Sequence, residues 1–228
     1  MPPIRAIIFD FGNVIAFFDY AHACQRLATP LGLTGPQLLE RALAAGLSDL
    51  VRDFEVGRIA EADFCRRACQ LAGLDHLHPQ EFAAAWSDIF TPNPPIASLI
   101  QRLAQAQIPL LLGSNTNPLH ARQFRRQFAN LLDQFDHLVL SYEVGHAKPD
   151  PAFYHACIHY AGVPPASCLF IDDLPENVAG AQAAGLHAWL YRDPLLPHPP
   201  PPTTRPPLSP LKLAKTSRFH HLADLTSR

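Results

Sequence analysis

Short apolar runs alternate with amphipathic stretches along most of the chain. Five of the apolar runs predict strands, at residues 6–9, 108–112, 137–140, 168–171 and 187–191. Helical spacing of apolar residues covers the stretches 96–107, 118–131, 150–162 and 175–185. Strands this apolar are usually buried on both faces, as they are in a parallel sheet. We therefore predict an α/β fold built on a doubly wound, Rossmann-like parallel sheet.

One long segment, residues 17–93, breaks this alternation because it carries helical patterns and no convincing strand. Helices are expected at residues 21–28, 36–53, 61–72 and 79–90. The segment follows the first strand directly, which would place it over the carboxyl ends of the strands, where open α/β sheets bind ligands. We therefore predict a catalytic core, residues 1–16 and 94–192, with an inserted α-helical cap domain at residues 17–93.

The last segment, residues 193–228, has a different composition. Nine prolines lie between Pro194 and Pro210, and a weak helical pattern follows at residues 219–225. Such a proline content favours an extended polyproline conformation over a packed core. We expect a linker followed by a short C-terminal helix, with a ligand for a proline-recognising domain as the alternative.

Composition narrows the range of partners. The 228 residues carry a net charge of −2, with acidic and basic residues interspersed, so no basic surface for nucleic acid is expected. No apolar run approaches the ~20 residues that cross a bilayer. The five cysteines form no C-x-x-C pair, which is typical of reduced thiols. These features predict a cytoplasmic protein with no nucleic-acid or membrane partner, and they leave its oligomeric state open.

Polar residues follow four of the predicted strands at the point where each strand ends. Asp10 follows the first strand, Ser114 and Asn115 the second, Lys148 lies just past the third, and Asp172-Asp173 follow the fourth. In a doubly wound sheet these points converge on one crevice. We therefore expect a carboxylate, a hydroxyl, an ammonium and an acidic pair to share one site.

The charges of these residues point to a cation and an anion as ligands. Asp10, Asp172 and Asp173 would repel one another unless a cation neutralised them, and Mg2+ suits an all-oxygen set of ligands. A metal, a lysine and a small hydroxyl together suit a phosphoryl group. Asp10 could then attack phosphorus and form an aspartyl phosphate.

These motifs, in this order, resemble those of the haloacid dehalogenase superfamily. The resemblance rests on residues 9–15, 114–120, 148–154 and 170–177, and it covers about residues 4–192 with the cap included. Within the superfamily, the chain is most similar to the bacterial α-glucose-1-phosphate phosphatase branch and then to the phosphatase domain of soluble epoxide hydrolase. The resemblance implies a hydrolase of phosphoric monoesters that binds Mg2+ and acts on a small phosphorylated metabolite, such as a sugar phosphate.

The resemblance also implies roles for the metal-site residues. Asp10 would be the nucleophile and a Mg2+ ligand, and the Gly12 carbonyl a second ligand. Asp173 would bind Mg2+ directly, and Asp172 would reach it directly or through water.

The phosphate would be held by a second group of residues. Ser114 and the Asn115 amide would bind it, Lys148 would neutralise both Asp10 and the phosphate, and Asn177 would orient the acidic loop. A helix-capping amide is an equal alternative for Asn177.

One position departs from the superfamily pattern. Most phosphatases of this superfamily carry a second Asp two residues after the nucleophile, where it protonates the leaving group, and this chain has Gly12 there. The source of that proton is therefore open, with Asp19, His22 and His146 as candidates. Without any acid, rates should depend steeply on the pKa of the leaving group.

Two other functions compete with the phosphatase. A 2-haloacid dehalogenase would use the same Asp to attack carbon and needs no leaving-group acid, but the acidic pair favours metal and phosphate. A non-catalytic binding module would present the polyproline segment to a partner, which the intact set of site residues argues against.

Overall fold

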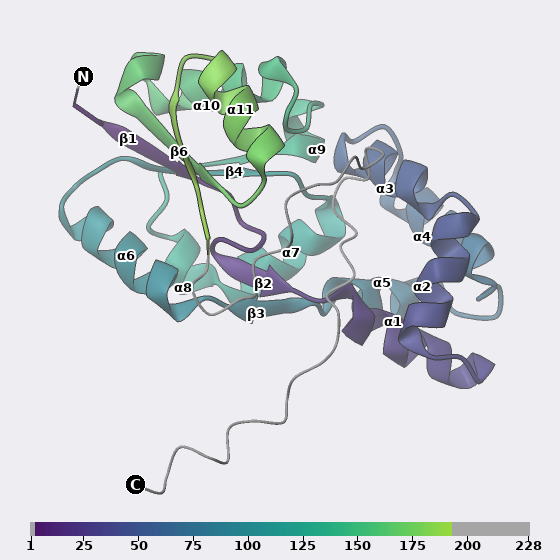
Figure 1. Cartoon of the computed structure of the whole chain (residues 1–228). Coiled ribbons are helices and arrows are strands. Elements are labelled where there is room, and N and C mark those ends of the chain that lie inside the picture. Colours follow the sequence, from purple (N-terminus) through teal and green to yellow (C-terminus); the bar gives the residue numbers. More distant parts are fainter. Residues whose placement is uncertain (1–2, 193–228) are drawn as a thin grey trace, which may run out of the picture.

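Five parallel strands form the central sheet, in the order β5-β4-β1-β6-β7 (Figure 1). The computed structural model describes residues 3–192, so the predicted linker and final helix at residues 193–228 lie outside the described residues. The strands are Ala6–Phe9 (β1), Leu110–Ser114 (β4), His137–Leu140 (β5), Cys168–Asp172 (β6) and His187–Leu190 (β7). All five predicted strands are present, and the central one, β1, pairs with β4 and β6.

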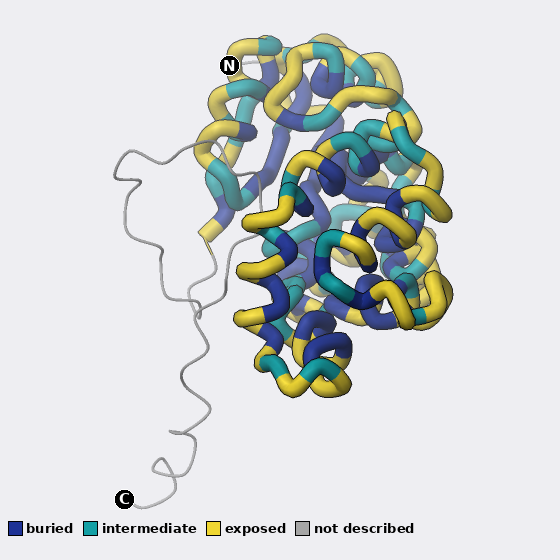
Figure 2. Tube along the Cα trace, turned by 90° about the vertical axis from the view of Figure 1, so that its right-hand side faces the viewer, coloured by how far each residue is buried: buried dark blue, intermediate teal, exposed yellow. Residues whose placement is uncertain are grey.

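Alternate residues of β1 pack against helices on opposite faces of the sheet. Ile7 and Phe9 contact the layer formed by α6 (Pro94–Gln105), α7 (Pro118–Gln127) and α8 (Ala129–Leu132). Ala6 and Ile8 contact the layer formed by α10 (Pro151–Ala161) and α11 (Pro175–Ala183). Helices on both faces confirm the predicted doubly wound sheet. The central strands β1, β4 and β6 are buried, whereas the edge strand β7 is partly exposed. The buried segments lie in the interior of the molecule (Figure 2).

The inserted segment is helical, as predicted, and its helices lie together beside the sheet (Figure 1). They are α1 (Tyr20–Ala28), α2 (Gly35–Ala44), α3 (Leu47–Glu55), α4 (Glu61–Ala72) and α5 (Pro79–Ser87). Their buried apolar residues form one cluster that includes Phe54, Phe64 and Trp86. Leu119 of α7 joins this cluster, so the cap packs directly on the core.

Three details of the helical prediction were wrong. The single helix expected at residues 36–53 is two helices, because Gly46 adopts a left-handed backbone (φ 103°) between them. The helix expected at 79–90 ends at Ser87. The helix expected at 118–131 breaks at Phe128, whose ring packs on Phe11.

The inserted segment was also expected to contain no strand, and this too was wrong. Ala16–Phe18 (β2) and Phe90–Pro92 (β3) pair in a two-stranded antiparallel sheet where the chain enters and leaves the cap, and we call this pair the hinge. Strands of three residues are too short to show an alternating pattern in the sequence. The exact boundaries of the predicted core and cap domains stay a prediction.

Short elements complete the described chain. They are the 3-10 helices η1 (Thr29–Leu31) and η2 (Pro165–Ser167) and the short helix α9 (Ser141–Val144). Within residues 3–192, no helix has the length and apolar character needed to cross a bilayer.

Candidate active site

Lys148 forms the centre of the polar cluster at the carboxyl end of the sheet. Its Nζ lies 2.8 Å from Asp10 Oδ1 and donates to Asp172 Oδ2 at 2.8 Å and to the Gly113 carbonyl oxygen at 2.9 Å. Lys148 is only 3 % exposed and Asp172 is fully buried. The structure therefore brings three of the predicted site residues into direct contact.

Sheet topology explains why these residues meet. Asp10 directly follows β1, Asp172 is the last residue of β6, and Ser114 is the last residue of β4. Because β4, β1 and β6 are adjacent and parallel, their carboxyl ends lie at the same edge. The Asp10 backbone N–H donates to the Ile171 carbonyl oxygen at 2.9 Å, which fixes the register of the two acidic strand ends.

Asp172 is held by the start of α11. Its Oδ1 accepts hydrogen bonds from the Leu174 backbone N–H at 2.9 Å and from Asn177 Nδ2 at 3.0 Å. The Tyr154 hydroxyl donates in turn to the Asn177 carbonyl oxygen at 2.8 Å. Asn177 therefore contacts the acidic loop through its side chain, in the position expected of a residue that orients it.

Asn13 orients the second carboxylate of the pair. Its Nδ2 donates to Asp173 Oδ2 at 3.1 Å, and its backbone is left-handed with φ 58°. Asn tolerates this conformation better than most residues do. No site role for Asn13 was predicted, although it lies in the same motif as Asp10.

Asn115 fixes the loop that carries Lys148. Its Oδ1 accepts the Lys148 backbone N–H at 2.7 Å, and its Nδ2 donates to the Lys148 carbonyl oxygen at 2.9 Å. The side-chain amide is therefore occupied by the Lys148 backbone, so a contact from Asn115 to phosphate would come from its backbone N–H. The neighbouring Ser114 hydroxyl is buried beside it.

Negative charge exceeds positive charge in this cluster. Burial raises the pKa of Asp10 to about 8; Lys148 opposes this shift, and Asp172 and Asp173 add to it. Burial alone would lower the pKa of Lys148, but the carboxylates of Asp10 and Asp172 raise it above its usual value. The raised pKa of Asp10 shows that the one ammonium does not balance three ionised carboxylates, whereas an added cation would let all three ionise.

The donor set fits a hard divalent cation. Asp10, Asp172 and Asp173 each offer a carboxylate oxygen, and these oxygens lie within 4.8 Å of one another. An all-oxygen set of this kind suits Mg2+ better than a metal that prefers nitrogen or sulfur. The site therefore has both the ligands and the charge that the predicted metal requires.

A cavity of about 50 Å³ lies between this edge of the sheet and the cap. The core lines it with Gly12, Ser114, Asn115 and Thr116, among others. Residues of the hinge and the cap, among them Phe18, Tyr20 and Glu55, form the opposite side. His120, which is buried near the start of α7, also lines the cavity. Glu55 was not predicted as a site residue, although the Glu55-x-Gly57 turn was apparent in the sequence.

Comparison with known families agrees with this geometry. A family model of haloacid dehalogenase-like hydrolases matches residues 4–185. The chain belongs to the haloacid dehalogenase-like hydrolases. The predicted superfamily is therefore confirmed.

Curated relatives of this hydrolase include two bacterial phosphatases. A phosphatase of Mycobacterium tuberculosis is 29 % identical over 205 residues, covering 82 % of this chain and 87 % of the relative. D-ribitol-5-phosphate phosphatase of Bacteroides thetaiotaomicron is 31 % identical over 193 residues, covering 82 % and 91 %. These relatives support the predicted enzyme class, a hydrolase of phosphoric monoesters.

Solved structures agree with the fold. A HAD family enzyme from Bacteroides thetaiotaomicron matches with a TM-score of 0.74 and 25 % identity, over 84 % of this chain and 95 % of that one. A complex of the same enzyme with magnesium and inorganic phosphate matches with a TM-score of 0.70 and 25 % identity, over 83 % and 94 %.

The three candidates for a leaving-group acid lie elsewhere in the hydrolase. Asp19 accepts the Ala21 backbone N–H at 2.8 Å and caps α1, and His22 is exposed on the same helix. His146 is exposed and lies 2.9 Å from Asp150. None of the three is among the residues that line the cavity in the described part of the chain.

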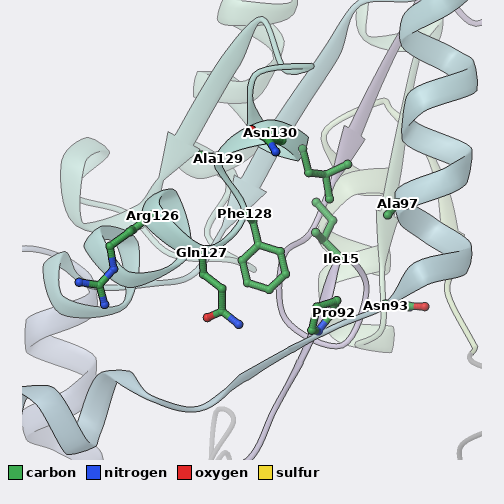
Figure 3. Close-up of a pocket in the computed structure, with 10 residues that line it drawn as sticks. Ile15, Pro92, Asn93, Ala97, Arg126, Gln127, Phe128, Ala129 and Asn130 are labelled. Carbon is green, nitrogen blue, oxygen red and sulfur yellow. The ribbon is translucent and has the colours of Figure 1, made fainter.

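A larger cavity, of about 280 Å³, lies between the hinge and helices α6 to α8. Ile15, Phe128 and Gln127 point into it (Figure 3), and Arg126 is the one charged residue among those described that line it. It contains none of the predicted site residues, so it offers no chemistry for the hydrolase reaction.

Proposed function

We propose that this protein is a Mg2+-dependent phosphatase that acts on a small phosphorylated metabolite through an aspartyl phosphate at Asp10. The observation that carries the proposal is the Lys148 ammonium held between Asp10 and Asp172, with Asp173 beside them. This arrangement combines a carboxylate nucleophile with an excess of negative charge for a metal and a lysine for phosphate.

Asp10, Asp173 and the Gly12 carbonyl would hold Mg2+, with Asp172 reaching it directly or through water. When bound, Mg2+ supplies positive charge to the phosphoryl oxygens and lets the anionic substrate approach a carboxylate. Asn13 and Asn177 would act as positioning residues, because each donates to one carboxylate of the acidic pair.

The phosphate would lie against Lys148, the Ser114 hydroxyl and the Asn115 backbone N–H. The Asp10 carboxylate is oriented through Oδ1, which accepts the Phe11 backbone N–H at 2.7 Å and contacts Lys148. The carboxylate attacks phosphorus, the ester oxygen departs with its electron pair, and water then hydrolyses the aspartyl phosphate. In phosphoryl transfer, most of the rate enhancement comes from positioning of the reacting groups and from electrostatic stabilisation of the transition state.

The relatives guide the choice of substrates to test. One of them is named for a polyol phosphate, D-ribitol 5-phosphate, and another from Thermotoga maritima for phosphorylated carbohydrates. Together with the resemblance to the α-glucose-1-phosphate phosphatase branch, these names favour sugar and polyol phosphates as the substrate class.

A screen of phosphorylated metabolites, with Mg2+ and with excess chelator, tests the proposal. We expect phosphate release in Mg2+ that chelation abolishes and that Asp10→Asn lacks. Halide release from 2-haloacids without metal dependence would favour a dehalogenase instead. Release of neither product by the folded protein would contradict an enzymatic role for the site.

A further inference from the structure

The Phe18 ring lies where Gly12 would carry the side chain of an acid. A Cβ atom added to Gly12 would lie 2.9 Å from Cε1 of Phe18, which is closer than real Cβ atoms approach. The Gly12 backbone is not left-handed, so the obstacle is the Phe18 ring. A side chain at this position would therefore have to displace the Phe18 ring, and glycine itself supplies no acid, so we look for an acid elsewhere around the cavity.

Glu55 enters the same cavity from the cap. It is the last residue of α3 and lines the cavity together with Gly12, Ser114 and Asn115. Within the described part of the chain, residues 3–192, Glu55 is the one carboxylic acid that lines this cavity.

The turn after Glu55 fixes this position against the core. Gly57 has φ 72°, and a Cβ atom added there would lie 2.5 Å from the Tyr142 carbonyl oxygen in α9. The next residue, Arg58, forms an ion pair with Asp53 at 3.0 Å across the turn. The cap therefore contacts the core closely two residues beyond Glu55, which limits how far Glu55 can move while the cap is closed.

The direction of attack places the leaving group on the cap side. Asp10 approaches phosphorus from the end of β1, and the attacking and leaving oxygens lie roughly in line in phosphoryl transfer. The leaving oxygen therefore points away from the sheet and into the cavity, toward the cap. An acid carried by the cap can reach this oxygen without occupying the space of Phe18.

We propose that Glu55 is the general acid and base of this hydrolase and takes the place of the residue that Gly12 lacks. The inference rests on the proposed phosphatase function. In the first step, Asp10 attacks phosphorus, the bond to the ester oxygen breaks, and that oxygen takes the proton of the Glu55 carboxyl group. In the second step, Glu55 accepts a proton from water, whose oxygen attacks phosphorus, and the electron pair of the broken bond returns to Asp10.

The surroundings of Glu55 suit both steps. Burial raises its pKa to about 7, and the positive charges of Lys148 and Arg52 limit this rise. Tyr20 from α1 and His120 from α7 also line the cavity. Burial raises the pKa of Tyr20 and lowers the pKa of His120 to about 4, so both side chains are neutral near pH 7. Near neutral pH, Glu55 is therefore populated in both the form that gives a proton and the form that takes one.

The test compares leaving groups of different acidity. The substrates are phenyl phosphate, which needs a proton on its leaving oxygen, and 2,4-dinitrophenyl phosphate, which does not. Glu55→Gln should lower kcat/KM for phenyl phosphate by ~10²- to 10⁴-fold and for 2,4-dinitrophenyl phosphate by less than about 10-fold. Asp63→Asn is the control, since Asp63 lies on cap helix α4 in an exposed ion pair with Arg66, and it should leave both values near those of the natural protein.

A second measurement needs no variant. For the natural protein, log kcat/KM should depend only weakly on leaving-group pKa across a series of aryl phosphates. A steep dependence of log kcat/KM on leaving-group pKa, or an equal loss of kcat/KM on both substrates in Glu55→Gln, would overturn the role of Glu55. Either result would leave the proposed phosphatase function in place. If the folded natural protein hydrolysed none of these esters in Mg2+, the proposed phosphatase function would fail, and this inference with it.

Discussion

At the scale of single residues, Lys148 supplies the positive charge between the acidic groups of the site. Its ammonium is buried and contacts two carboxylates and one carbonyl oxygen. Removal of one partner from a buried ion pair leaves an uncompensated charge and typically costs about 3–5 kcal/mol. The lysine should therefore contribute to the free energy of unfolding as well as to the proposed phosphate binding.

Lys148→Met should lower the free energy of unfolding by about 3–5 kcal/mol in the absence of metal and should abolish turnover. Arg125→Met is the control, because Arg125 pairs with Glu143 on the surface and such pairs contribute about 0–1 kcal/mol. Urea denaturation at neutral pH measures both. Equal free energies of unfolding for the two variants would show that the buried ion pairs of Lys148 do not stabilise the fold.

His120 gives the fold a dependence on pH. Burial lowers its pKa to about 4, although its bond to the Trp86 carbonyl oxygen works in the opposite direction. A neutral ring with its proton on Nε2 donates to that carbonyl at 3.1 Å and accepts from Asn117 Nδ2 at 3.0 Å. The folded protein therefore holds this histidine neutral at a pH where the unfolded chain protonates it.

The sign of the effect follows from this lowered pKa. Below pH ~6.5 the unfolded chain binds a proton that folded His120 does not bind until about pH 4, so stability falls as pH falls through that window. Each pH unit in the window costs about 1.4 kcal/mol. His120→Gln should remove this part of the acid destabilisation, whereas His155→Gln, on an exposed helix face, should retain it. Urea midpoints measured between pH 7 and pH 4 would decide, and parallel profiles for both variants would refute the assignment.

At the scale of elements, the sequence predicts the parts of the fold that repeat a simple pattern. The five strands and the helical nature of residues 17–93 follow from apolar runs and helical spacing. The break at Gly46 and the hinge of β2 and β3 could not be predicted, because a single backbone angle and pairing over long sequence distance decide them.

The residues of the candidate site also differ in whether the sequence predicts them. Asp10, Lys148 and Asp172 could be predicted because strand ends fix where they lie. The roles of Asn13 and Glu55 could not, since each depends on a contact between segments that are distant along the chain.

The turn at Gly57 offers a test of how the cap meets the core. Gly57→Ala would combine the cost of a left-handed backbone with a clash against the Tyr142 carbonyl oxygen. It should lower kcat/KM by about 10-fold or more, because a displacement of ~1 Å at an active site can cost that much in rate. Gly162→Ala is a matched control, because Gly162 also has a positive φ (63°) but nothing lies within 4 Å of an added Cβ. Similar activity of the two variants would show that the cap contact at Gly57 has no part in catalysis.

At the scale of the whole molecule, the cap and the core enclose a cavity too small for a sugar phosphate. A volume of about 50 Å³ compares with roughly 300–1,000 Å³ for ordinary ligand pockets. The cap is held on the core by contacts such as the exposed ion pair between Arg122 and Glu61, at 2.8 Å. A sugar phosphate therefore needs more room than this arrangement of cap and core provides. Exposed ion pairs contribute only about 0–1 kcal/mol against a separation of the two, whereas the packing of Leu119 in the cap cluster opposes it.

Metal binding should stabilise the whole fold. Because the three acidic ligands come together only in the folded chain, Mg2+ at 100 times its Kd should add about 2.7 kcal/mol to the free energy of unfolding. Thermal unfolding with Mg2+ and with chelator measures this gain as a rise in Tm. Asp173→Asn should lose most of the rise, and Asp150→Asn, a capping residue outside the site, should keep it. A rise of equal size in both variants would place the metal elsewhere.

If the proposed function is right, Asp10 carries the phosphoryl group during turnover, and reductive trapping detects it there. The protein is quenched in acid during turnover of a phosphate ester in Mg2+, treated with borohydride, and its peptides are analysed by mass spectrometry. Borohydride converts an aspartyl phosphate to homoserine, so we expect homoserine at position 10 and none in Asp10→Asn. A phosphoryl group on Ser114 instead, with Asp10 unmodified during active turnover, would contradict it.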